Sequence, residues 1–164
     1  MGEQLMRRHK VSYLDTSATG TPDYTYMSAG FTDLTDARNP DVSSKIYIND
    51  EAESKTIRKY APEWAFSFDR DSEDAVHAYI VAVGEELKTG SDAESSYIEF
   101  LTTDVDPISG LVDARRYPVA IQVDSTGSGA GGEELVCSGT LHGVGDPTEG
   151  SFDTADNSFT PDVS

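Results

Sequence analysis

The clearest pattern of hydrophobic and polar positions lies in the middle of the chain, over residues 64–103. An alternating segment at 64–69 is followed by a segment with helical spacing at 72–88 and a second alternating segment at 97–103. Elsewhere the apolar runs are short and alternate with polar residues, which is typical of half-buried strands. The sequence therefore predicts a mainly β protein with one α-helix.

The helix prediction rests on a stripe of apolar residues along one face. Asp71 or Ser72 can cap its start, and Gly90 follows its end. The preceding strand places three aromatic rings on one face, at alternate positions, and we expect the helix to pack on them. The stripe consists of Val76, Tyr79, Ile80, Val83 and Leu87, and the aromatic face of Trp64, Phe66 and Phe68.

The remaining patterns predict a single domain over residues 1–164, with about eight short strands. Residues 30–41 have little periodicity and contain the turn signal Asn39-Pro40, so a long ordered loop is expected there. A polar hairpin is expected at about 44–60, and a polar C-terminal tail at about 153–164. These features favour a two-sheet β-sandwich or barrel with one flanking α-helix.

Charge is distributed unevenly along the chain. The formal net charge is −18, and residues 61–164 carry only four of the twelve Lys and Arg against 21 of the acids. Such an acidic surface disfavours nucleic-acid binding through a basic patch, because it repels phosphates. The single Cys137 excludes an internal disulfide and favours a reducing compartment. We expect no signal peptide, lipid anchor or membrane span, because no apolar run approaches about 18 residues.

Motifs that could carry chemistry fail on their context. Gly127, Gly129 and Gly132 match a dinucleotide fingerprint, but two glutamates and a strand follow where a helix N-terminus is needed. The acids that begin at Asp69 resemble a calcium loop without its essential glycine and final glutamate. The three histidines lie on separate elements, and Cys137 lies in an apolar strand. We therefore expect no catalytic, cofactor or metal site.

Three ordered stretches together resemble the tail tube (major tail) proteins of long-tailed bacteriophages, and they cover most of residues 30–161. The first is Gly-Phe-Thr-Asp-Leu-Thr-Asp-Ala-Arg-Asn-Pro at 30–40. The second combines Phe-Ser-Phe-Asp at 66–69 with Asp-Ala-Val-His at 74–77 and Gly-Ser-Asp-Ala at 90–93. The third combines Gly-Asp-Pro at 145–147 with Gly-Ser-Phe-Asp-Thr at 150–154 and Ser-Phe-Thr at 158–160. Residues 1–26 match less well.

The resemblance implies two packed β-sheets flanked by an α-helix, in a subunit that is not an enzyme and needs no cofactor. In that family, homo-hexameric rings stack into a hollow tube through which the genome leaves the capsid. The implied partners are further copies of the chain and the tail-tip, tape-measure and tail-terminator proteins. The implied location is the virion tail, which is made and assembled in the host cytoplasm, with no membrane contact and no specific binding of the passing DNA.

Two hypotheses connect this resemblance with the residues. An acidic lumen would repel DNA phosphates and let the genome slide. The segments at 30–41 and 44–60 are long polar extensions that a monomer has little reason to order. We therefore expect them to contact neighbouring subunits or rings. The candidate contact residues are Thr32, Asp33, Asp36, Arg38, Lys45, Lys55, Arg58 and Lys59.

Two other classes of function remain open from the sequence. One is a β-sandwich binding module, such as a virion decoration or adhesion domain, which would be a monomer with a carbohydrate or protein ligand. The other is a small hydrolase, which requires a polar cluster in a pocket.

Overall fold

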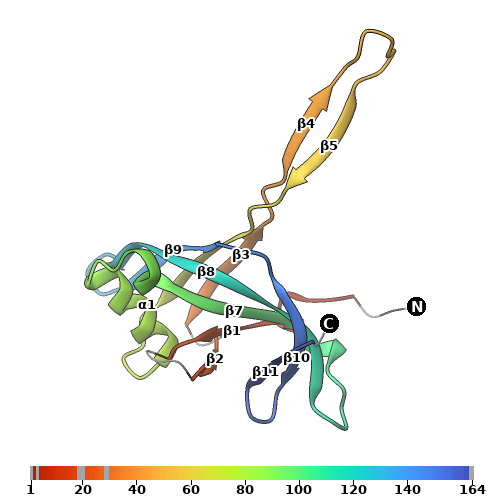
Figure 1. Ribbon diagram of the computed structural model, residues 1–164. Coiled ribbons are helices and arrows are strands. Elements are labelled where there is room, and N and C mark those ends of the chain that lie inside the picture. The colour runs from red at the N-terminus through yellow and green to blue at the C-terminus, as the bar shows by residue number, and fades with distance from the viewer. Residues whose placement is uncertain (1, 3, 18–20, 28–29, 163–164) are drawn as a thin grey trace.

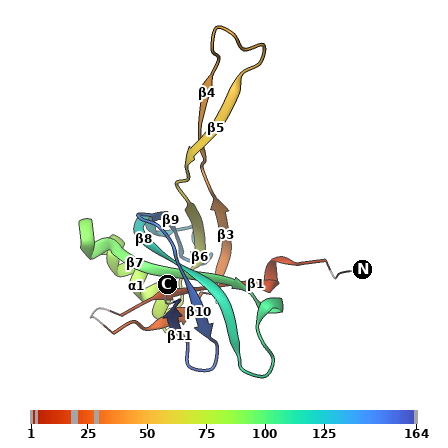
Figure 2. The ribbon, with the colours of Figure 1, turned by 45° about the vertical axis from the view of Figure 1, so that its right-hand side comes forward.

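The protein consists of a curved antiparallel β-sheet, one α-helix and a two-stranded extension that projects from the sheet (Figure 1). This computed structural model describes residues 2, 4–17, 21–27 and 30–162. Figure 2 shows that the extension also stands clear of the sheet in a second view. We call residues 41–60 the arm and the rest of the described chain the body.

Nine strands form the body's sheet, all paired antiparallel. The main path runs β2-β1-β7-β8-β9-β6-β3, and β10 pairs with both β8 and β11. The strands are β1 (Lys10–Asp15), β2 (Tyr24–Tyr26), β3 (Phe31–Ala37), β6 (Glu63–Asp69), β7 (Glu94–Leu101), β8 (Leu111–Ser128), β9 (Val136–Gly143), β10 (Thr148–Asp153) and β11 (Ser158–Pro161). Short 3-10 turns lie at Arg7–His9, Gly90–Ala93 and Thr102–Asp104.

Strand β8 pairs with three other strands of the sheet. Its 18 residues pair with β10 near the start, with β7 in the middle and with β9 toward the end. Strand β8 is therefore much longer than the short strands that the sequence pattern predicts, and it continues to Ser128. The predicted fold class, mainly β with one flanking helix, is confirmed. The two sheets expected of a sandwich are parts of one continuous sheet.

Two apolar clusters lie on opposite faces of β7. Tyr97 belongs to the larger cluster, between the sheet and the helix, together with Trp64 and Phe68. Ile98 and Phe100, which alternate with Tyr97, belong to a smaller cluster under the β10–β11 hairpin. Since both faces of β7 are buried, a polar side chain on this strand needs partners within the protein.

The helix α1 (Ala75–Glu85) packs on the larger cluster through Val76, Ile80 and Val83, as the apolar stripe predicts. The predicted bounds 72–88 are too wide, because Asp74 caps the N-terminus instead of Asp71 or Ser72. Its Oδ1 accepts the backbone N–H of Val76 at 2.9 Å and of His77 at 3.1 Å. Leu87 lies beyond the C-terminus with a positive φ of 53° and is exposed, so the stripe ends before it.

The loop predicted at 30–41 is wrong for most of its length, because residues 31–37 form the edge strand β3 on β6. A β-bulge between Phe31 and Asp33 hides the alternation. It places Phe31 and Leu34, three residues apart, on the same apolar cluster. The predicted polar tail is also partly a strand, because β11 pairs with β10 and sets Phe159 opposite Phe152.

Candidate functional site

The arm is a long β-hairpin. Its strands β4 (Asp41–Lys45) and β5 (Ser54–Lys59) pair with each other and, within the described residues, with no other strand. The hairpin predicted at about 44–60 is therefore present and begins three residues earlier. All six residues of β5 are exposed to solvent. Two-stranded hairpins are marginally stable in water on their own, so this one is suited to packing against a partner.

The arm exposes a set of large apolar and aromatic side chains, which the expectation of a polar hairpin missed. Val42 and Ile57 lie directly opposite each other across the two strands. At the tip, the exposed fraction of Ile48 reaches 109%. Such side chains gathered on one projection mark an interaction surface. The set is Val42, Ile46, Tyr47, Ile48, Ile57 and Tyr60.

The arm is electrically neutral, although the protein is strongly acidic. Lys45, Lys55, Arg58 and Lys59 balance four acids in residues 41–60, so the formal charge of −18 belongs to the rest of the chain. Within the described residues these four cations form no ion pair. They are therefore available to a partner.

The other candidate contact residues lie on β3 and at its end. The hydroxyl of Thr32 donates to the Ser67 carbonyl at 3.2 Å, and Asp33 accepts the Thr35 hydroxyl at 2.6 Å. Asp36 already has partners in its own chain, as described next. Within the described residues, no ion pair joins Asp33 or Asp36 to the arm's cations. Within one chain the structure thus keeps the candidate residues of β3 apart from the candidate cations of the arm.

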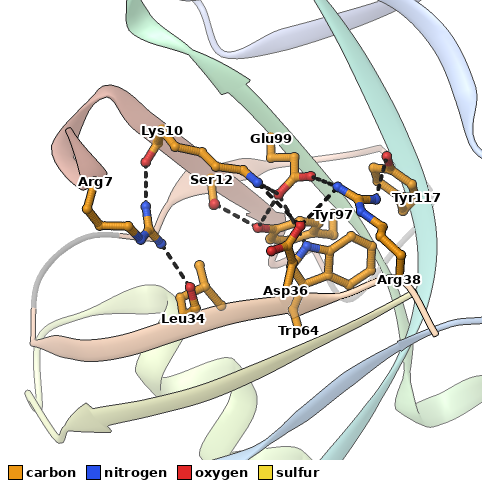
Figure 3. Close-up of polar contacts among 10 residues, drawn as sticks. All are labelled: Arg7, Lys10, Ser12, Leu34, Asp36, Arg38, Trp64, Tyr97, Glu99 and Tyr117. Carbon is orange, nitrogen blue, oxygen red and sulfur yellow. Dashed lines mark hydrogen bonds and ion pairs between the residues drawn. The ribbon is translucent and has the colours of Figure 1, made fainter. Parts of the chain in front are cut away.

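A compact charged cluster lies at the root of the arm (Figure 3). We call Lys10, Asp36, Arg38 and Glu99 the root cluster. The Arg38 guanidinium Nη2 lies 3.1 Å from Asp36 Oδ2 and 3.1 Å from Glu99 Oε1. The Lys10 ammonium lies 3.6 Å from the same Asp36 oxygen and 3.4 Å from Glu99 Oε2. Two cations and two anions make the cluster neutral.

Glu99 is the most buried member, with 8% of its side chain exposed. It lies on β7 on the same face as Tyr97, whose hydroxyl donates to Glu99 Oε2 at 3.1 Å. The indole Nε1–H of Trp64 donates to the same oxygen at 3.2 Å. A buried carboxylate is stable only when charges and hydrogen bonds compensate it, and here four groups do so.

Aromatic rings surround the cluster. The Arg38 guanidinium carbon lies 5.9 Å from the ring centroid of Trp64 and 5.8 Å from that of Tyr117, whose hydroxyl accepts Nη1 at 3.2 Å. Burial alone would lower the pKa of Arg38, but the bonds and charges of Tyr117 and Glu99 raise it overall, so it stays charged. Burial, with the charge of Glu99, raises the pKa of Tyr97 well above its usual value.

Of the root cluster, the sequence analysis named only Asp36 and Arg38. Glu99 offered a signal, because it is an acid at an alternate position from Tyr97 in an otherwise buried strand. Lys10 offered none, since its role depends on β1 lying beside both β7 and the end of β3 in the folded protein. Arg7 adds a link nearby, donating to the carbonyls of Lys10 at 2.8 Å and Leu34 at 3.1 Å.

Two open depressions flank the root cluster. One, of about 420 Å³, is lined by Arg38, Glu99, Arg115 and Glu149 among others. The other, of about 220 Å³, is lined by Lys10, Asp36 and Trp64 among others. Charges of both signs line each of them. Among the described residues, no group of three or more His, Cys, Asp or Glu is placed to hold a metal ion, and no helix is long and apolar enough to cross a membrane.

Comparison with known proteins identifies the fold. No protein-family model and no curated protein matches the chain. A solved structure of the tail of an empty GTA particle, with C6 symmetry, matches with a TM-score of 0.60 and 10% identity over 96% of this chain and 99% of that one. The six-fold symmetrised baseplate of the anti-feeding prophage matches with a TM-score of 0.56 and 10% identity over 91% of this chain and 97% of that one. The chain therefore has the fold of tail and baseplate proteins, as the sequence resemblance implied.

Proposed function

We propose that this protein is a structural subunit of a phage-type tail, which assembles as hexameric rings that stack into a hollow tube through which DNA passes. In this proposal the protein has no enzymatic activity, and it is located in the virion tail after assembly in the host cytoplasm. Its partners are further copies of itself and the tail-tip, tape-measure and tail-terminator proteins. The fold supports this role, since similar chains are found in tail and baseplate assemblies with six-fold symmetry.

The arm is the observation that carries the proposal. It projects from the body (Figure 2). It exposes six large apolar or aromatic side chains, and its four cations have no ion-pair partner within the described residues. A monomer gains nothing from this arrangement, whereas a stacked assembly would cover the arm with the next ring.

The charge distribution supports the same role. With a neutral arm, the charge of −18 lies on the rest of the chain. A ring of six such subunits presents an acidic surface, which repels DNA phosphates and lets DNA slide without binding. We propose that the arm's Lys55, Arg58 and Lys59 contact acids of an adjacent ring. Asp33 is the better candidate there, because Asp36 is compensated within its own chain.

The direct test combines size-exclusion light scattering with negative-stain electron microscopy of the purified protein over a range of concentrations. Rings or tubes with a central channel are the expected result. A sample that stays monomeric is then mixed with purified tail-tip complex as a seed, because such subunits can require an initiator. A monomer that does not polymerise on the seed would contradict the proposal and favour the β-sandwich binding module.

A further inference from the structure

The arm is joined to the body by a break in the strand ladder. The β3–β6 pairing ends at Ala37 and Glu63, and the β4–β5 pairing begins at Asp41 and Lys59. Two short segments, 38–40 and 60–62, connect these pairs and are joined to each other by two hydrogen bonds. The Ala61 N–H donates to the Arg38 carbonyl at 3.0 Å, and the Asn39 amide donates to the Ala61 carbonyl at 3.0 Å. Such a break allows the arm to bend, because no continuous ladder stiffens it.

Arg38 is the first residue of the segment 38–40, and its side chain ties that segment to the body. Its backbone belongs to the arm root, and its guanidinium reaches Glu99 on β7 and Tyr117 on β8 (Figure 3). In the other segment, the Pro62 carbonyl accepts the backbone N–H of Gly143 on β9 at 2.8 Å. Within the described residues, the hydrogen bonds of residues 41–60 are internal to the arm. The direction of the arm therefore depends on how firmly the body holds these two segments, and the side chain that holds the first of them is Arg38, through Glu99 and Tyr117.

Glu99 is built to hold its position. Trp64 from β6 and Tyr97 from its own strand donate to one carboxylate oxygen, which leaves the other oxygen for Arg38. Ser12 on β1 and Tyr97 share a further hydrogen bond of 2.7 Å, which fixes the phenol. The carboxylate is thus anchored by the body on one side and presents a fixed charge to the arm root on the other.

We propose that Arg38 and Glu99 form a positioning lock, which holds the arm in the one direction that lets it dock on a neighbouring subunit. Breaking the lock lets the arm swing about its root while the body stays folded. The role of the lock in docking rests on the proposed tube function, but its control of the arm's direction does not.

The chain offers a matched pair of variants. Arg38→Gln removes the cation that ties the segment 38–40 to the body and leaves Glu99 compensated by Lys10, Trp64 and Tyr97. Lys10→Met removes the other cation from the same two carboxylates but touches no arm residue. Both variants alter the root cluster, and only the first removes a side chain that ties the arm root to the body. Arg38→Lys keeps the charge with a single donor group, so it restores the lock in part.

The measurement is the distance distribution between spin labels at Glu51→Cys near the arm tip and Asp92→Cys on the body, in monomeric protein. Both positions are exposed, whereas the native Cys137 is fully buried and resists labelling. We expect one narrow distribution for the parent and Lys10→Met, a broad one for Arg38→Gln and an intermediate one for Arg38→Lys. An Arg38→Gln distribution as narrow as the parent's would overturn the lock, and so would equal broadening by Lys10→Met.

Assembly is measured separately on unlabelled protein. If the arm spends about a tenth of its time in the docking direction, the critical concentration for tube formation rises about tenfold in Arg38→Gln. An unchanged critical concentration, with a broadened distance distribution, would refute the role of the lock in docking. Failure of the parent to assemble would count against the tube proposal alone, because the distance measurement uses monomers.

Discussion

The body and the arm obey opposite rules, although one chain folds into both. In the body, Trp64, Phe68 and Tyr97 are at most 1% exposed, and even the carboxylate of Glu99 is compensated by four groups of the same chain. In the arm, apolar side chains and cations face solvent. The body buries a core of its own, although it also exposes some apolar side chains such as Ile108, whereas the arm contributes to neither apolar cluster and has the composition of half an interface. We therefore expect changes in the body to alter folding and changes in the arm to alter assembly.

Removing the arm should have the largest effect, because it should abolish assembly and leave the folding of the body almost unchanged. Asp41 and Lys59 pair across the strands, so residues 42–58 can be replaced by Asn-Gly, which closes a two-residue hairpin. We expect the melting temperature of the body to change by only a few degrees, because the arm adds nothing to either apolar cluster. Tube formation in electron micrographs should be lost. Tubes that still form without the arm would contradict the claim that assembly depends on the arm.

Truncating one large side chain in each region should separate folding from assembly. Phe68 is fully buried, with its ring 4.9 Å from that of Phe31 and 4.2 Å from that of His77. Phe68→Ala should lower the free energy of unfolding by about 3–5 kcal/mol in a urea titration. Ile57→Ala should change it by less than about 0.5 kcal/mol, because Ile57 is exposed, but should weaken assembly. Equal losses of stability would show that the arm is part of the folding unit.

Reversing the arm's charge should have a smaller effect, which depends on salt. We expect Lys55→Glu, Arg58→Glu and Lys59→Glu together to raise the critical concentration for assembly several-fold at low salt. The difference should shrink near 1 M salt, where charges are screened beyond about 3 Å. The control keeps every charge, with Lys55→Arg, Arg58→Lys and Lys59→Arg. If the reversed variant assembles as the control does, with the same salt dependence, the arm's cations do not bind acids.

The elements that local pattern alone determines could be predicted from the sequence. The helix stripe of Val76, Ile80 and Val83 and the aromatic face of β6 lie where the periodicity indicates, because side-chain spacing follows directly from backbone geometry. Strand β3 escaped detection because one bulge shifted its alternation by a residue. A pattern with period two cannot show an inserted residue without knowledge of the partner strand.

The root cluster could be predicted only in part. Asp36 and Arg38 belong to the segment that the sequence resemblance singled out, but Lys10 and Glu99 lie 28 and 61 residues from Arg38 along the chain. The pairing of β1 with β7 brings Lys10 near Glu99, and the curvature of the sheet brings β3, at the other end of the strand order, to both of them. The apolar residues Ile46, Tyr47 and Ile48 of the arm can be read from the sequence. Their exposure could not be predicted, because it depends on whether another part of the described chain packs against the arm.

The last comparison is between one thiol in each region. Burial raises the pKa of the Cys137 thiol to about 11, and the weaker influence of Arg70 opposes this shift. Because the thiolate is the reactive form, Cys137 should react roughly 200-fold more slowly at pH 8 than a thiol with the usual pKa of about 8.5, before the added effect of burial. A cysteine introduced in the arm by Ser54→Cys should react at the full rate, which a chromogenic disulfide reagent measures.

The same shift gives stability a pH dependence with a definite sign. Between about 8.5 and about 11, the unfolded thiol loses a proton that the folded thiol keeps, so stability should fall as the pH rises through this range. Tyr97, with its raised pKa, adds a loss of the same sign above about 10. Urea titrations from pH 7.5 to 9.5 should therefore show a decline in the parent that Cys137→Ala lacks and that the armless variant keeps. If removing the arm abolished this loss of stability, the pH dependence would come from the arm and not from the buried Cys137, which would contradict the separation of core and arm.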